Sequence, residues 1–167
     1  FRYPRGNGTG VELPGIKETL EIGKGKIILE GKNLAILNFG ARLDECKKAS
    51  EVLKKKGITI SIFDARFAKP LDERSIIELA SNHEAIITIE EGSIGGFGSH
   101  ITKLLSDRGF FDKGLKFRSM ILPDRFLDQD TPDKMYKTAG LDCESIVQKI
   151  ENVLNSNVVI AKNKSLS

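Results

Sequence analysis

Three short apolar runs, separated by longer amphipathic segments, constrain the fold of this chain more than any other feature. They cover residues 34–39, 58–63 and 85–89, are rich in isoleucine and leucine, and the first is closed by Gly40. Strands that are apolar throughout are typical of a parallel sheet covered on both faces. Successive parallel strands need a long crossover connection, which is usually a helix. The sequence therefore predicts repeated strand–helix–strand units.

Helical patterns fill the intervals between the runs and follow them. Apolar side chains recur at steps of three and four residues from Leu43 to Leu53, with charged residues on the other face, and Gly57 marks the end of that helix. A helix after the third run carries Ile101 and Leu105 on its inner face. Capping residues stand before three further predicted helices: Asp72, Thr131 with Pro132 behind it, and Asp142.

Two weaker strand patterns complete the predicted sheet. Residues 26–30 suit an extra edge strand, and residues 115–122 suit a fourth parallel strand, although charged residues interrupt it. The predicted fold is α/β, with a doubly wound, mostly parallel five-stranded sheet, one antiparallel edge strand and helices on both faces. We expect this domain to span residues 26–155. The glycine-rich residues 1–25 are interpreted as an interdomain linker and what precedes it, and residues 156–167 as a flexible tail.

Composition excludes several classes of partner. The 26 Lys and Arg residues are interspersed with 23 Asp and Glu residues, so the net charge of +3 marks neither a nucleic-acid surface nor a membrane surface. No apolar run approaches the roughly 20 residues of a membrane helix. Cys46 and Cys143 are far apart without a CxxC motif, which favours neither a disulfide scaffold nor a zinc site. We therefore expect a soluble, cytoplasmic protein without nucleic-acid or membrane partners.

The glycine-rich loop after the third run is the first candidate for a ligand site. Gly95, Gly96 and Gly98 precede a helix, and backbone N–H groups at such a position can bind a phosphate. The loop lacks the Gly-Lys-Ser/Thr of a P-loop and the spacing of GxGxxG, and Glu90 and Glu91 just before it would repel a phosphate. We interpret it as a structural turn, with a nucleotide cradle as the alternative.

Few other side chains in the predicted domain suggest chemistry. Glu90 and Glu91 are adjacent at a strand end, so their side chains should point to opposite faces, which argues against an acid–base pair and for one of them as a loop anchor. His83 and His100 lack metal-ligand spacing and are interpreted as surface or capping residues. Cys46 lies on the inner stripe of a helix and should belong to the core.

Arg5 is the strongest candidate for binding a substrate. Pro4 restricts the backbone before it and Gly6 frees the chain after it, and a guanidinium held in this way suits bidentate recognition of a phosphate or carboxylate. Arg2 is a weaker candidate of the same kind. The alternative is that both arginines are simply exposed.

Six motifs occur in an order that resembles a known family. They are RYPRGN at 2–7, IGKG at 22–25, LNFG at 37–40, DARFAKPLD at 64–72, TIEEGSIGGFGS at 88–99 and LPDRF at 122–126. In combination they resemble the C-terminal part of the 1-deoxy-D-xylulose-5-phosphate synthase family over residues 1–154. The resemblance implies the third domain of a transketolase-type enzyme, and residues 1–25 would then be the end of a preceding pyrimidine-binding domain and a linker.

The resemblance also implies an activity for the whole protein. Members condense pyruvate with glyceraldehyde 3-phosphate, with loss of carbon dioxide, at the start of the non-mevalonate isoprenoid pathway, and they use thiamine diphosphate and Mg²⁺. The residues that bind both cofactors lie upstream of the YPRG motif, so we expect no catalytic, cofactor-binding or metal-binding residue here, and the chain alone should be inactive. Arg5 carries over as the arginine that holds the substrate phosphate. The implied partners are the other two domains of the synthase, in a homodimer.

A second hypothesis belongs to another functional class. The chain could be a free-standing α/β domain with a nucleotide-binding or regulatory role that uses the loop from Gly95 to Gly98. The absence of a phosphate-binding lysine in that loop argues against it.

Overall fold

The computed structural model describes residues 10, 15 and 19–156 of the chain. Its strands are β1 (Lys26–Leu29), β2 (Leu34–Phe39), β3 (Ile60–Asp64), β4 (Ala85–Glu90) and β5 (Lys116–Met120). Its α-helices are α1 (Leu43–Lys55), α2 (Glu73–Asn82), α3 (Phe97–Asp107), α4 (Pro132–Ala139) and α5 (Cys143–Asn155), and a 3₁₀ turn covers Phe111–Lys113. Arg2, Arg5 and most of the predicted linker, together with the predicted tail from residue 157 on, lie outside the described residues.

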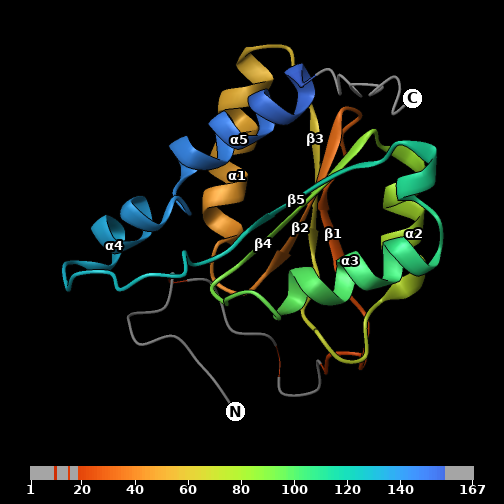
Figure 1. Ribbon diagram of the computed structural model, residues 1–167, viewed down its shortest axis with the longest axis horizontal. Coiled ribbons are helices and arrows are strands. Elements are labelled where there is room, and N and C mark those ends of the chain that lie inside the picture. The colour runs from red at the N-terminus through yellow and green to blue at the C-terminus, as the bar shows by residue number, and fades with distance from the viewer. Residues whose placement is uncertain (1–9, 11–14, 16–18, 157–167) are drawn as a thin grey trace, which may run out of the picture.

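The five strands form one sheet in the order β1-β3-β2-β4-β5 (Figure 1). β2, β3, β4 and β5 are parallel, and β1 pairs with β3 in the antiparallel direction. This confirms the predicted doubly wound sheet with one antiparallel edge strand. Because β1 is antiparallel, its first residue, Lys26, lies opposite Asp64 at the carboxyl end of β3.

Helices cover both faces of the sheet and enclose two apolar cores. α1 and α5 lie on one face, and α2 and α3 on the other, while α4 projects from the body of the domain (Figure 1). Alternate residues of β2 serve the two cores: Ile36 packs toward α1 and α5, and Leu37 toward α2 and α3, and both are wholly buried. Burying a side chain of this size stabilises the fold by about 1.5–3 kcal/mol.

Local hydrogen bonds explain where the structure departs from the predicted boundaries. β3 begins at Ile60 rather than at residue 58, because the N–H of Ile58 donates to the carbonyl of Leu53 and closes α1, while the N–H of Thr59 donates to the Asn33 side chain. β5 is shorter than the predicted 115–122 strand. Two predicted caps are confirmed: Asp72 accepts from the N–H of Ser75, and Asp142 from the N–H of Ser145. Thr131 stands at the N-cap with Pro132 as the first residue of α4, as predicted, but its hydroxyl makes no capping bond.

The connections identify where a ligand would bind in a sheet of this kind. The chain leaves β2 toward α1 on one face, and it leaves β4, the neighbouring strand, toward α3 on the other. In open α/β sheets the crevice between two such diverging loops, at the carboxyl ends of the strands, is the usual ligand site. We call this end of the sheet the carboxyl edge. No helix among the described residues is long and apolar enough to cross a membrane.

Candidate functional site

The side chain of Glu90, the last residue of β4, occupies the N-terminus of α3. Its Oε2 accepts a hydrogen bond of 3.0 Å from the N–H of Phe97, and its Oε1 accepts one of 2.8 Å from the N–H of Gly98. Glu90 is 4% exposed, so both bonds are shielded from water. A carboxylate at this position is favoured by the free N–H groups and by the helix dipole. The prediction that one of the two glutamates anchors the loop is confirmed.

No N–H group at residues 95–100 is left for a ligand. Besides the two bonds to Glu90, the N–H of Gly95 donates to the Ser99 hydroxyl, and that of Gly96 donates to the Ser93 carbonyl. The N–H groups of Ser99 and His100 both donate to the carbonyl of Gly96. A phosphate cradle needs free donors at the helix N-terminus. The loop is therefore a self-contained turn, which argues against the nucleotide-binding alternative.

Two glycines of the loop are required by the closeness of β4 rather than by unusual backbone angles. A Cβ on Gly96 would collide with the carboxylate of Glu90, and one on Gly98 would lie 2.8 Å from the Thr88 hydroxyl. Gly96 has a φ of −80°, which any residue can adopt. Gly95 is different, since its φ of +96° itself favours glycine.

Replacing Gly96 with alanine should lower the free energy of unfolding by about 1–2 kcal/mol, because the methyl group displaces the carboxylate that caps α3. Urea unfolding followed by circular dichroism measures this. Gly114→Ala measures the cost of backbone strain without a steric clash, since Gly114 has a φ of +86° but no atom within 4 Å of the added Cβ. A Gly96→Ala variant as stable as the parent would contradict the steric role.

On the other face of the sheet, Glu91 takes part in a cluster with Arg42 and Tyr136. Nε of Arg42 lies 3.0 Å from Oε1 of Glu91, and the Arg42 guanidinium carbon lies 3.4 Å from the centre of the Tyr136 ring. Burial, together with a hydrogen bond to Glu91, raises the pKa of the Tyr136 phenol. The cluster joins the start of α1, the end of β4 and the middle of α4. Glu90 and Glu91 therefore serve opposite faces, as the sequence predicts.

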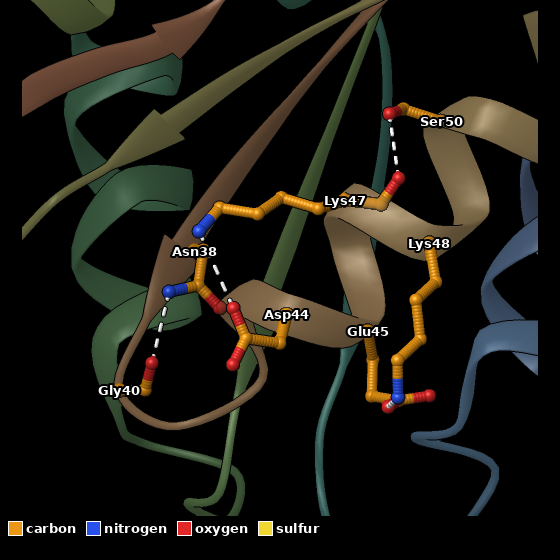
Figure 2. Close-up of polar contacts among 7 residues, drawn as sticks. All are labelled: Asn38, Gly40, Asp44, Glu45, Lys47, Lys48 and Ser50. Atoms are coloured by element: carbon orange, nitrogen blue, oxygen red, sulfur yellow. Dashed lines mark hydrogen bonds and ion pairs between the residues drawn. The ribbon is translucent and has the colours of Figure 1, made fainter. Parts of the chain in front are cut away.

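Polar contacts also occur in the turn after β2 and in the first turns of α1, a helix whose N-terminus has no side-chain cap (Figure 2). The amide of Asn38, which is wholly buried, donates to the Gly40 carbonyl over 3.0 Å. Glu45 pairs with Lys48 over 2.6 Å and also accepts a hydrogen bond from the N–H of Cys143, the first residue of α5. Carboxylates of the protein itself thus hold the N-termini of α2, α3 and α5.

The predicted cysteine and histidine roles agree with their environments. Cys46 is wholly buried, and burial raises the pKa of its thiol to about 12, so it stays protonated at neutral pH. Nε2 of His83 lies 2.9 Å from the Ser61 hydroxyl, and Nδ1 of the same ring lies 2.8 Å from the Leu79 carbonyl. His83 thus ends α2 as a capping residue. Within the described residues, no group of three or more His, Cys, Asp or Glu side chains could hold a metal ion.

Sequence reasoning missed the cluster of Arg42, Glu91 and Tyr136 as a unit. The sequence draws attention to Glu91 only beside Glu90, and nothing in the local pattern associates Arg42 with a residue of α4. Arg42 and Glu91 are close because the sheet order places the ends of β2 and β4 side by side, and Tyr136 reaches them from α4. Arg5, the predicted substrate-binding residue, lies outside the described residues, so its role stays a prediction.

These features define a class of protein: a doubly wound α/β domain in which Glu90 closes the glycine loop after β4, at the usual position of a ligand. The chain belongs to the transketolase C-terminal domain family, since the family model described as "Transketolase, C-terminal domain" matches residues 23–146. The predicted relation to transketolase-type proteins is confirmed at this level. Thiamine-dependent transfer is the context of that family.

Solved structures with the same fold include one described as "Split gene transketolase, inactive beta4 tetramer", in which "beta4" does not refer to a strand. It is 26% identical to this chain, with a TM-score of 0.75, and the match covers 86% of this chain and 46% of that one. Two transketolase variants from Pichia stipitis are 15% identical with TM-scores of 0.57, and the match covers 79% of this chain and 18% of theirs. The chain thus spans less than half of each of these proteins.

Proposed function

We propose that this chain is the C-terminal domain of a 1-deoxy-D-xylulose-5-phosphate synthase. The observation that carries the proposal is the match to the transketolase C-terminal family over residues 23–146, together with the RYPRGN motif that precedes it at residues 2–7. The whole protein would condense pyruvate with glyceraldehyde 3-phosphate and release carbon dioxide. It would act as a homodimer in the cytoplasm, and its other two domains would be the direct partners of this one.

The described residues do not fit thiamine diphosphate or Mg²⁺. The N–H groups of residues 95–100 are all engaged, and Glu90, the buried carboxylate there, already binds two of them. A diphosphate would meet carboxylates at the N-termini of α2, α3 and α5, where it would need donors. We therefore assign cofactor chemistry to the upstream domains and derive no step of it from this chain.

Arg5 is the one residue of this chain that we assign to the substrate, as the group that binds the phosphate of glyceraldehyde 3-phosphate. A guanidinium can donate two parallel hydrogen bonds to a phosphate, and each charge-assisted bond contributes roughly 1.5–3 kcal/mol. In the complete enzyme, Arg5→Ala should lower kcat/KM for glyceraldehyde 3-phosphate by on the order of tenfold or more, since about 1.4 kcal/mol is a factor of ten. Arg5→Lys should recover only part of the loss.

Steady-state kinetics with each substrate varied in turn test both the function and this role. Pyruvate has no phosphate, so its use should suffer less. An equal loss for both substrates would mean that Arg5 supports the local structure and not the phosphate. A complete gene product that does not form 1-deoxyxylulose 5-phosphate from these two substrates would contradict the proposed function itself.

A further inference from the structure

The outer edge of β5 has unpaired backbone groups. β5 is the last strand of the sheet, and among the described residues it pairs only with β4. The N–H of Lys116 donates to the Glu84 carbonyl, so the even-numbered residues of the strand face β4. The N–H groups of Ser119 and Ile121 therefore point outward, and no described residue accepts from them. An open edge of this kind is a template on which another extended segment can pair.

A hollow of about 350 Å³ lies beside this edge, between β5 and α5. Ser119 and Ile121 line it from the strand, and Gln148, Lys149 and Asn152 line it from the helix. A strand added to β5 would point alternate side chains toward the α5 side of the sheet. The hollow offers room for those side chains.

The charged side chains at the hollow and along the outer edge are cationic. Lys149 forms no ion pair within the described part of the chain, and none of the described residues that line the hollow is acidic. Arg118 lies at the outer edge, where its Nη1 donates to the carbonyl of Phe117 over 2.7 Å. Glu144 and Glu151, the acidic residues of α5, pair with lysines elsewhere. The charges therefore favour an acidic partner.

Two other occupants of the edge are disfavoured. Residues 157–167 lie outside the described residues, and they carry Lys162 and Lys164 but no acidic residue. A parallel strand reached from β5 through α5 would also need a left-handed crossover, since β4–α3–β5 advances in the same direction with its helix on the opposite face (Figure 1). A second copy that paired β5 with β5 would bring Arg118 of the two chains close together, and like charges oppose this.

We propose that the outer edge of β5 binds an extended, acidic segment of another protein, which adds a sixth strand to the sheet and places carboxylates beside Lys149. Main-chain hydrogen bonds from Ser119 and Ile121 supply the affinity, and the cations select acidic side chains. Lys116 and Arg118 oppose pairing with basic strands. The site lies along the flank of the sheet and not at the carboxyl edge, and it does not depend on the proposed reaction.

Hydrogen exchange of the complete gene product tests the proposal, with an excess of a synthetic peptide that alternates glutamate with valine as the probe. Exchange at the N–H groups of Ser119 and Ile121 should be slowed on the order of tenfold or more. A peptide that alternates lysine with valine should leave it unchanged. No slowing by the acidic peptide, or equal slowing by both peptides, would overturn the proposal. Slow exchange before any peptide is added would also overturn it, because another part of the protein or a second copy would then cover the edge.

Substitutions separate main-chain pairing from charge. Ser119→Pro removes one outward N–H at a position where an edge strand tolerates proline, and it should abolish the protection of Ile121, whereas Ser119→Ala should keep it. Lys149→Glu should weaken peptide binding about tenfold or more. Lys32→Glu, which changes an exposed lysine between β1 and β2 on the far side of the sheet, should have no effect. Unchanged exchange in β2 and β4 shows that the variants are folded. Binding that survives both Ser119→Pro and Lys149→Glu would contradict the assigned site.

Discussion

Replacing Glu90 with alanine should lower the free energy of unfolding by about 3 kcal/mol or more. The change removes two charge-assisted hydrogen bonds, at 2.8 Å and 3.0 Å, and leaves the buried N–H groups of Phe97 and Gly98 without partners. Each such bond contributes about 1.5–3 kcal/mol, and buried donors without acceptors add their own cost. Because α3 covers β4 on one face of the sheet, the loss should affect the whole cooperative transition.

The conservative variant Glu90→Gln sharpens this test. Its amide offers one oxygen to two N–H donors and turns its own NH₂ group toward one of them, so it should recover at most part of the loss. Glu84→Gln is a suitable control, since Glu84 is exposed and its nearest lysine nitrogen is 3.9 Å away. Urea unfolding gives all three stabilities. If Glu90→Ala were no less stable than Glu84→Gln, the carboxylate would not be what holds the start of α3.

Replacing Arg42 with alanine should cost about 2 kcal/mol and release α4 from the domain. The guanidinium stacks on Tyr136 and lies beside Glu91, in a site where only 14% of the Arg42 side chain is exposed. A partly buried cation over an aromatic ring contributes about 1–2 kcal/mol, and Glu91 would lose its partner. No residue of α4 is fully buried, so this cluster is a principal attachment of the helix.

Two measurements separate the local effect on α4 from general destabilisation. Hydrogen exchange should quicken in α4 more than in α5, since α5 is anchored by its own core residues. Burial and the contact with Glu91 raise the pKa of Tyr136, so release of α4 should let Tyr136 titrate at a lower pH than in the parent. Arg42→Lys should keep part of the stacking. Unaltered exchange in α4 would show that other contacts hold it.

Much of this fold could be predicted because its signals are local. The apolar runs at 34–39 and 85–89 correspond to β2 and β4, since a strand covered on both faces tolerates few polar residues. Asp72 and Asp142 cap helices as predicted, because an N-cap needs only a short side chain three residues before its donor. The opposite directions of Glu90 and Glu91 follow from strand geometry alone.

The features that escaped prediction depend on contacts between distant segments or on the orientation of single side chains. Arg42 and Tyr136 come together only because β2 and β4 are neighbours and α4 folds back over their ends. Thr131 stands at the N-cap before Pro132 as its motif predicts, but its hydroxyl makes no capping bond, which a pattern of residue types does not show. The exposure of Phe126 could not be read from LPDRF, because a pattern of residue types does not show which side chain is left uncovered.

The antiparallel direction of β1 has a consequence for where the chain enters the domain. β1 begins opposite Asp64, at the carboxyl end of β3, so the chain reaches the sheet at the same end as the loops that follow β2 and β4. That is also the end at which open α/β sheets usually bind their ligands. In this domain, the point of attachment to the preceding part of the chain and the usual position of a ligand therefore coincide.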